Sequence, residues 1–285
     1  MTLDPTNPQE GIYPDASEEV YRAAAAVSQS ELKEFGNSAT PLHFRHRDKK
    51  EPTPDMEFGT VCHAAILQPE RLHLSYYLRP NEYEAEVKGK KVMKPWHGGS
   101  EACKEWLNLH SDRPVMTSEQ MAKVPHIVER LKALLEFGSA LKIGQTEVAF
   151  FKRDEETGLL LKCRVDLIAT DAKGQTWLFD PKKVQSGEAT EKAFGKSCMD
   201  YGYHIQHQSY LAITGASRMV FVPFDDDKPF DACQYEPDSD MCAEGYREWR
   251  RLLLAYAKCV KEDHWPGYPQ AIQKLGLPEW MKRRI

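Results

Sequence analysis

The chain has 285 residues, of which 41% are hydrophobic, 28% are charged and 10% are aromatic. This composition supplies enough apolar side chains for a packed core and excludes collagen-like, low-complexity and intrinsically disordered classes. The formal net charge is −5, so a polyanion such as DNA would have to bind through a local basic groove rather than through overall charge.

The sequence does not indicate a membrane-spanning or secreted protein. The longest apolar runs, such as residues 219–222, are far shorter than the roughly 18 residues that a membrane helix needs. The amino terminus lacks the basic start and apolar stretch of a secretory signal. The seven cysteines are odd in number and include no Cys-x-x-Cys pair, which argues against a disulfide framework or a zinc ribbon. We therefore expect reduced, mostly buried thiols and a cytoplasmic protein.

The amino-terminal part is predicted to be an arm followed by two helices. Residues 1–27 are rich in proline and are expected to form an irregular arm. Ser28 and Glu31 have the spacing of a capping box, which predicts a helix that begins at residue 28 and ends near residues 37–41. A second helix is predicted over residues 57–67, where apolar side chains recur on one face, and it carries His63.

The next segment is predicted to be a loop and a helix. Residues 79–100 combine lysines and glycines with Trp96, which favours a mobile basic loop. Its lysines are Lys88, Lys90, Lys91 and Lys94. A helix over residues 117–137, closed by Gly138, is expected to follow.

From residue 145 the hydrophobic period becomes that of β-strands. Residues 146–152, 159–169 and 176–184 are three extended runs separated by turns, which predicts an antiparallel meander. A helix over 188–213, a strand over 218–224 and a final helix over 240–260 complete the pattern. This order predicts a single α/β domain with helical additions at both ends.

Two acids and a lysine are predicted to meet on adjacent strands. Asp166 stands near the end of one strand, and Asp180 and Lys182 lie two residues apart on the next strand, hence on one face. Two buried acids repel each other unless a cation lies between them, and carboxylate oxygens suit Mg²⁺ or Mn²⁺. Such an ion can polarise a phosphoryl oxygen and activate water, which predicts phosphodiester hydrolysis. The alternative is an ordinary salt bridge of these acids with Arg164, Lys182 or Lys183.

Asp166, the Asp180-Pro181-Lys182 motif and residues 201–210, which include Tyr203, Gln206 and Tyr210, resemble the PD-(D/E)xK nucleases. Within that superfamily the chain is similar to the phage and prophage exonuclease VIII (RecE-type) branch. Further matches lie at residues 28–32, 59–63, 67–70, 265–268 and 277–280, so the resemblance spans about residues 28–280. It implies a mixed central sheet flanked by helices, with one domain over 28–285, a catalytic core over about 57–224 and a helical extension over about 238–285.

The resemblance also implies roles for individual residues. Asp166 and Asp180 would bind the catalytic metal, the main-chain carbonyl of Pro181 would add a ligand, and Lys182 would assist the attacking water. His63 would be a further metal ligand or its support. Glu147, on the first strand of the meander, would complete the carboxylate cluster, with a solvent-facing glutamate as the alternative. Pro181 departs from the aliphatic residue usual in the family, and Lys183 departs from the small hydroxyl residue.

Several residues are candidates for contacts with DNA. Gln206 and Tyr210 are four residues apart, hence on one helical face. The pair resembles the motif that RecB-like nucleases place beside the active site and the DNA backbone, with a polar face and a buried aromatic ring as the alternative. Tyr203 is a further candidate for contact with DNA. Lysines can follow phosphates and an aromatic ring can stack on a frayed end. The four lysines of the predicted loop and Trp96 therefore form a second candidate contact, with a solvated loop as the alternative.

The resemblance implies a Mg²⁺-dependent exonuclease, with Mn²⁺ as a possible substitute, that acts on linear double-stranded DNA. It implies 5′-to-3′ digestion from duplex ends, which leaves 3′ single strands for recombination with a single-strand annealing protein of the RecT type. It also implies a homo-oligomer, a tetrameric ring around DNA, in a bacterial host cell. The alternatives are a structure-specific or restriction-like endonuclease and a DNA-end binding protein that does not cut.

Overall fold

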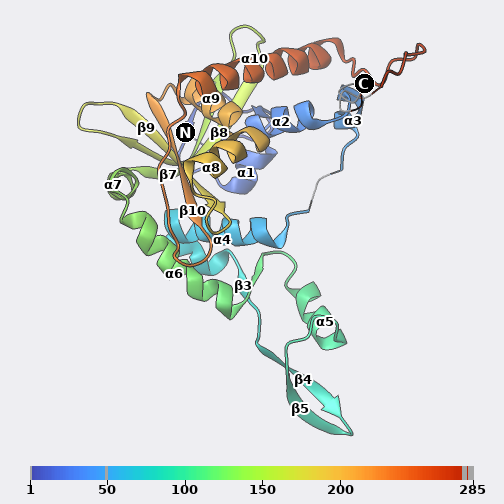
Figure 1. Cartoon of the computed structure of the whole chain (residues 1–285), viewed down its shortest axis with the longest axis vertical. Coiled ribbons are helices and arrows are strands. Elements are labelled where there is room, and N and C mark those ends of the chain that lie inside the picture. Colours follow the sequence, from blue (N-terminus) through green and yellow to red (C-terminus); the bar gives the residue numbers. More distant parts are fainter. Residues whose placement is uncertain (1, 49–50, 278–280, 282–285) are drawn as a thin grey trace.

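A mixed β-sheet lies at the centre of the molecule (Figure 1). The computed structural model describes residues 2–48, 51–277 and 281. In these ranges six strands form the sheet in the order β1-β7-β8-β9-β10, with β2 paired to β8. Their bounds are β1 Gly11–Tyr13, β2 Val27–Ser28, β7 Gln145–Arg153, β8 Leu160–Thr170, β9 Thr176–Val184 and β10 Arg218–Asp225. Strands β7, β8 and β9 form the predicted antiparallel meander, and β10 pairs with β9 in parallel.

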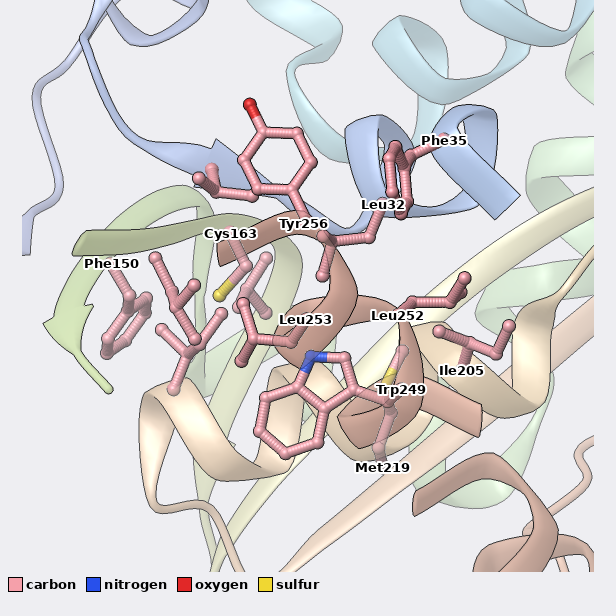
Figure 2. Packing of buried hydrophobic residues seen from close by; sticks show 14 of the residues in the cluster. Leu32, Phe35, Phe150, Cys163, Ile205, Met219, Trp249, Leu252, Leu253 and Tyr256 are labelled. Atoms are coloured by element: carbon pink, nitrogen blue, oxygen red, sulfur yellow. The ribbon is translucent and has the colours of Figure 1, made fainter. Parts of the chain in front are cut away.

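One face of the sheet is covered by helices that come from both ends of the sequence. They are α2 (Gln29–Asn37), α8 (Glu191–Asp200), α9 (Tyr203–Thr214) and α10 (Ser239–Glu262). Figure 2 shows Trp249, Leu252 and Leu253 of α10 packed into the cluster that joins these helices to the strands. Each large apolar side chain buried in this way contributes about 1.5–3 kcal/mol, so α10 is an integral part of the core.

The opposite face of the sheet packs against α4 (Pro54–Leu67), α6 (Ser118–Lys132) and α7 (Leu135–Ile143). Helix α4 was predicted over residues 57–67, and its start at Pro54 follows from the Thr53 side chain, which accepts a hydrogen bond from the Met56 backbone N–H. The arrangement is the mixed sheet flanked by helices that the sequence predicted.

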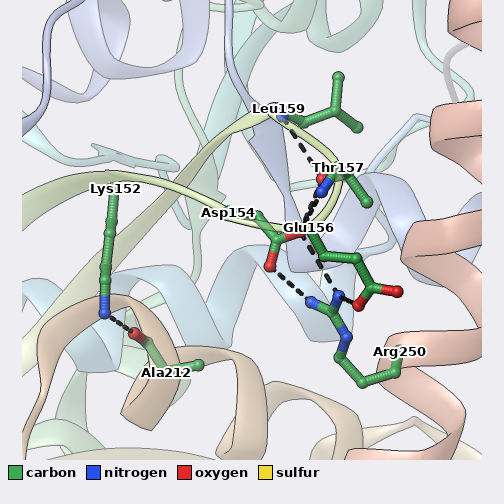
Figure 3. A network of polar contacts seen from close by, with 7 residues as sticks. All are labelled: Lys152, Asp154, Glu156, Thr157, Leu159, Ala212 and Arg250. Carbon is green, nitrogen blue, oxygen red and sulfur yellow. Dashed lines mark hydrogen bonds and ion pairs between the residues drawn. The ribbon is translucent and has the colours of Figure 1, made fainter.

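The turn between β7 and β8 is attached to α10 by an arginine (Figure 3). Arg250 donates to both carboxylate oxygens of Asp154 and also pairs with Glu156. On the neighbouring strand, the Lys152 ammonium donates to the carbonyl of Ala212 on α9, across 2.9 Å. These contacts hold the outer end of the β7–β8 hairpin against the helical layer.

A small projection extends from the α4–α6 side of the molecule (Figure 1). It contains the hairpin of β4 (Glu82–Val87) and β5 (Lys90–Pro95), followed by α5 (Glu101–Leu109). The remaining elements are α1 (Glu18–Ala23), α3 (Pro41–Arg45), the 3₁₀ helix η1 (Pro69–Leu74), β3 (Tyr77–Leu78) and β6 (Val115–Met116).

The structure corrects two predictions of irregular segments. The arm over residues 1–27 is not irregular, because it contains β1, paired with β7, helix α1 and the start of β2. The predicted loop over residues 79–100 contains the β4–β5 hairpin, in which glutamates alternate along one strand. Short strands of this kind depend on pairing with a partner strand, and a local hydrophobic pattern does not reveal that partner.

Two predicted helices are each divided in two. The helix expected over 117–137 ends at Lys132, and Gly138 lies inside α7, where a Cβ atom would stand 2.1 Å from the Lys132 carbonyl oxygen. The helix expected over 188–213 is interrupted at Gly202, whose φ of 68° lies in the left-handed region. At Gly202 glycine allows the left-handed turn between the two helices, and at Gly138 the missing Cβ atom allows α7 to approach the end of α6 closely.

The carboxyl-terminal part of the chain differs from the predicted helical extension. In the described part of the extension predicted over about 238–285, helix α10 ends at Glu262, and residues 263–277 contain no helix or strand. The family match at residues 277–280 includes 278–280, which lie outside the described residues.

All seven cysteines lie in the described ranges and are free thiols, as predicted. Among the described residues, no helix has both the length and the apolar character required to cross a membrane.

Candidate active site

Three acids occupy one row across three adjacent strands. Strand β7 pairs with β8 at Thr146↔Leu167 and Val148↔Val165, which brings Glu147 to the position opposite Asp166. The β8–β9 ladder ends at Leu167↔Phe179, so Asp166 and Asp180 are the next residues beyond it. The sheet therefore gathers Glu147, Asp166 and Asp180 where β8 and β9 begin to separate.

The backbone is irregular at this row. Glu147 has a φ of 59°, a left-handed conformation that is costly for residues other than glycine. Val165 belongs to the core under α9 and α10, whereas Leu167 belongs to the core under α4 and α6. Residues two apart on a regular strand share a face, so the alternation of β8 is interrupted at Asp166. Strain of this kind often accompanies functional sites.

Asp180 is the most deeply buried acid of the row, with 3% of its surface exposed. Its Oδ2 accepts a hydrogen bond from Gln206 Nε2 at 2.5 Å and pairs with Lys182 Nζ at 2.8 Å. Its Oδ1 is buried and has no hydrogen-bond partner within the described residues. One oxygen is thus fixed by two donors while the other is left available, although an unsatisfied buried carboxylate oxygen is costly.

Lys182 lies between the acids and an aromatic ring. Its Nζ is 4.8 Å from the centre of the Tyr203 ring, at the start of α9. Burial opposes the charged form, but the electrostatic effects of Asp180, Tyr203 and Asp166 outweigh it and raise the pKa of Lys182. The ammonium therefore stays charged beside the carboxylates.

Asp166 of β8 lies close to His63 of α4. His63 Nδ1, on α4, lies 3.4 Å from Asp166 Oδ2, and both side chains are partly accessible, with 28% and 21% exposed. Burial and the charges of Asp180 and Glu147 raise the pKa of Asp166 well above its usual value. Burial lowers the pKa of His63, against the opposing effects of Asp180 and the Pro181 backbone.

Glu147 is held by an arginine from the neighbouring strand. Arg164 Nε is 3.1 Å from Glu147 Oε2 and also donates to the Glu147 carbonyl at 3.3 Å. Arg164 Nη1 lies 3.7 Å from Oε2 of Glu18, which is the first residue of α1. Burial raises the pKa of Glu147; Arg164 opposes this, while Glu18 and Asp180 add to it.

Comparison with known proteins identifies the family of the chain. Residues 28–276 match the model of a family described as a PDDEXK-like domain of unknown function (DUF3799). The chain belongs to this family. No functionally curated protein matches the sequence.

One solved structure shows the same fold, and a second is similar over part of the chain. A protein from Eubacterium rectale described as a "putative exonuclease" is similar over 87% of each chain, with a TM-score of 0.55 and 13% sequence identity. An alkaline exonuclease from Laribacter hongkongensis (LHK-Exo) is matched over 58% of this chain and 86% of its own, with a TM-score of 0.28 and 16% identity. The first similarity supports the fold, and membership of the PDDEXK-like family together with the Asp, Asp and Lys set supports a nuclease.

The residues at the site of this PDDEXK-like chain fit a divalent cation. Within the described ranges, no three side chains of His, Cys, Asp or Glu form a complete metal-binding group. The candidate donors are the Oδ1 of Asp180, which has no hydrogen-bond partner among the described residues, and the carboxylate of Asp166, which lies 3.4 Å from His63 Nδ1. A hard cation prefers such oxygen ligands and keeps several waters. It would also relieve the repulsion that raises the pKa of Asp166.

The residues predicted to contact DNA fall into two groups. Gln206 is 8% exposed and holds Asp180, and the Tyr210 hydroxyl donates to the Arg164 carbonyl at 3.2 Å, so both side chains support the strands of the site. Lys88, Lys90, Lys91 and Lys94 lie on the β4–β5 hairpin, which projects away from strands β7, β8 and β9 that carry the three acids (Figure 1). Trp96 packs edge-on against Trp106 of α5, with ring centres 5.5 Å apart.

Sequence reasoning missed the support that Arg164 and Glu18 give to Glu147. Arg164 is two residues before Asp166 on the same strand, and that spacing was a usable signal. Glu18 lies in the segment expected to be irregular, and its place near Arg164 depends on the packing of α1 against the sheet. Sequence reasoning also missed that Gln206, predicted to contact DNA, is buried and donates to Asp180.

Proposed function

We propose that this protein is a Mg²⁺-dependent exonuclease that degrades linear double-stranded DNA from its ends. The observation that carries the proposal is Asp180, whose Oδ2 is fixed by Lys182 and Gln206 while its buried Oδ1 remains free for a cation. A RecE-type activity would proceed from 5′ to 3′ and leave 3′ single strands. An annealing protein of the RecT type would then be the partner, in the cytoplasm of a bacterial cell.

Each residue of the site would have a different role in hydrolysis. Asp180 and Asp166 would hold Mg²⁺ or Mn²⁺, with the Pro181 carbonyl and His63 beside them. A bound divalent ion would polarise the phosphoryl oxygen and lower the pKa of a water. The Lys182 ammonium would orient that water and offset the negative charge that develops on the phosphate. Gln206 would keep the Asp180 carboxylate in one orientation.

A homo-oligomer is part of the proposal. A closed ring allows an acidic protein to stay on DNA, because only the channel needs positive charge. A tetramer is the form implied by the resemblance to RecE-type enzymes. An endonuclease with the same metal site, or a DNA-end binding protein that does not cut, are the competing functions.

The test uses two DNA molecules of equal mass, one linear and one covalently closed. The linear duplex carries different labels at its 5′ and 3′ ends, and the protein is supplied with Mg²⁺ or Mn²⁺. The Lys182→Ala variant removes the ammonium beside Asp180. The matched control is Lys183→Ala, because the adjacent Lys183 pairs with Asp55 and Asp226 outside the row of acids.

Loss of the linear duplex alone, starting at the 5′ label, is the expected result. Lys182→Ala should lower the rate by about 10²–10³-fold, the usual loss when one group that stabilises developing negative charge is removed, whereas Lys183→Ala should still cut. Cleavage of the closed circle would identify an endonuclease. Binding of DNA ends without cleavage in either metal would favour the binding protein.

A further inference from the structure

The β4–β5 hairpin leaves most of its surface uncovered. All six residues of β5 and four of the six residues of β4 are exposed. Lys88 and Gly89 connect the strands with positive φ values of 52° and 73°, as the tight type I′ turn requires. A two-stranded hairpin alone is marginally stable in water, so a further contact would stabilise this one.

The pairing register gives the hairpin two faces of opposite charge. Directly opposite residues of an antiparallel pair project to the same face, and the register pairs Glu84 with Met93 and Val87 with Lys90. The acidic face therefore contains Glu82, Glu84, Glu86, Lys91, Met93 and Pro95. The basic face contains Tyr83, Ala85, Val87, Lys90, Val92 and Lys94.

Only part of this charge is neutralised within the chain. Lys91 pairs with Glu84 at 2.7 Å on the acidic face. Glu82 and Glu86 on that face, and Lys90 and Lys94 on the basic face, form no ion pair with any of the residues that the structure describes. Each face also exposes an apolar side chain, with 59% of Met93 and 38% of Val92 accessible.

We propose that the hairpin is an assembly surface on which the acidic face of one copy packs against the basic face of the next copy. A second copy would pair the free glutamates and the free lysines at once and would cover Val92 and Met93. Two acidic faces or two basic faces would repel, so charge fixes the order of the faces. DNA phosphates would pair with the lysines alone and would leave the acidic face without a partner.

A contact between two different faces is heterologous. Each copy gives one face and receives the other, so the contact continues from copy to copy until it closes into a ring or extends as a chain. The inference rests on the oligomer named in the proposed function and deepens it by naming the contact. Its readout is molecular mass, so a protein that assembles but does not cut would refute the nuclease and keep the hairpin contact.

The test measures the mass of the full chain by size-exclusion chromatography with light scattering. Glu82→Lys with Glu86→Lys makes both faces basic, and Lys90→Glu with Lys94→Glu makes both faces acidic. Each double variant should lose the assembly and approach the monomer mass of 32.6 kDa. The matched controls reverse the same number of charges elsewhere, at exposed Glu129 with Glu155 and at exposed Lys132 with Lys142, and should keep the wild-type mass.

Mixing the two double variants gives the decisive result. An entirely basic hairpin complements an entirely acidic one, so the equimolar mixture should regain an assembly although each variant alone does not. This recovery also shows that both variants are folded. A monomeric wild type, an unchanged mass in both double variants, or a mixture that stays monomeric would each overturn the proposal. Weaker DNA binding by the acidic variant with an unchanged mass would assign the hairpin to DNA instead.

Discussion

Gln206 on α9 donates a hydrogen bond to the buried Oδ2 of Asp180 on β9, across 2.5 Å. The bond ties the helical layer to the strand that carries two of the proposed active-site residues. Neither Gln206 nor Asp180 is accessible to bulk water to any great extent, so the bond is not weakened by exchange with solvent.

Replacement of Gln206 by leucine should lower nuclease activity about 10- to 100-fold, the usual cost of removing a side chain that orients a metal ligand. Leucine keeps most of the volume but cannot donate to Asp180, so the carboxylate loses one of its two fixed partners. Initial rates at several Mg²⁺ concentrations would measure the change. Gln208→Leu is the control, because the Gln208 amide contacts His207 and not the site; equal losses in both variants would contradict the assigned role.

Substitutions of Glu147 should distinguish the cost of its backbone conformation from the function of its side chain. Its φ of 59° costs about 1–2 kcal/mol for an L-residue with a Cβ atom, and glycine avoids this cost. Glu147→Gly should therefore be more stable than Glu147→Ala by about 1 kcal/mol, the reverse of the usual order in a strand. Urea unfolding of the two variants measures the difference.

Activity gives Glu147 a second, independent readout. Both substitutions remove the carboxylate, so both should lose activity to a similar extent if that carboxylate completes the acidic row. Full activity in the glycine variant would mean that Glu147 shapes the strand without taking part in the chemistry.

The meander and three of the site residues could be predicted because they depend on local patterns. Alternating apolar residues define β8 and β9, and a two-residue spacing places Asp180 and Lys182 on one face. The hydrogen bond from Gln206 could not be predicted in the same way. It depends on how α9 packs across the sheet, and α9 begins only after Gly202 turns the chain.

The β4–β5 hairpin shows a second reason for a wrong prediction. Its lysines and glycines led to the prediction of a loop. Glu82, Glu84 and Glu86 nevertheless recur with the two-residue period of a strand. Polar alternation on a strand exposed on both faces lacks the apolar contrast by which strands are normally recognised. Strands β1 and β2 are shorter still, and they exist because β7 and β8 offer free edges.

Replacement of two helical glycines by alanine should change the stability of the protein in opposite directions. A Cβ atom on Gly245 of α10 would stand 2.2 Å from the His204 carbonyl oxygen of α9, so Gly245→Ala must push the helices apart. Overpacking of this kind costs about 1–3 kcal/mol. Gly195 lies within α8 and has nothing within 4 Å of the same position, so Gly195→Ala should stabilise by up to about 1 kcal/mol. Thermal unfolding of both variants tests this, and a neutral Gly245→Ala would show that α9 and α10 are not closely packed.

His207 should make stability depend on pH. Its Nε2 lies 3.2 Å from the Met219 carbonyl oxygen and its Nδ1 lies 3.0 Å from Gln208 Nε2, contacts that suit a neutral ring with the proton on Nε2. Burial lowers the pKa of His207, against the opposing effect of the Met219 carbonyl. The unfolded chain, with a histidine pKa of about 6.5, therefore binds more protons in the window below that value. The contribution is fully present above about pH 6.5 and is lost as the pH falls toward the folded pKa.

The measurement compares urea unfolding of the wild type and His207→Gln at pH 8 and pH 5.5. The wild type should lose more stability than the variant between the two values, because glutamine does not titrate. His63 is partly buried and has a lowered pKa as well, but it is present in both proteins and its effect cancels in the comparison. His73→Gln, which removes an exposed imidazole, controls for the loss of a histidine as such. Parallel pH dependence in the wild type and His207→Gln would show that this ring takes up its proton in the folded protein without cost.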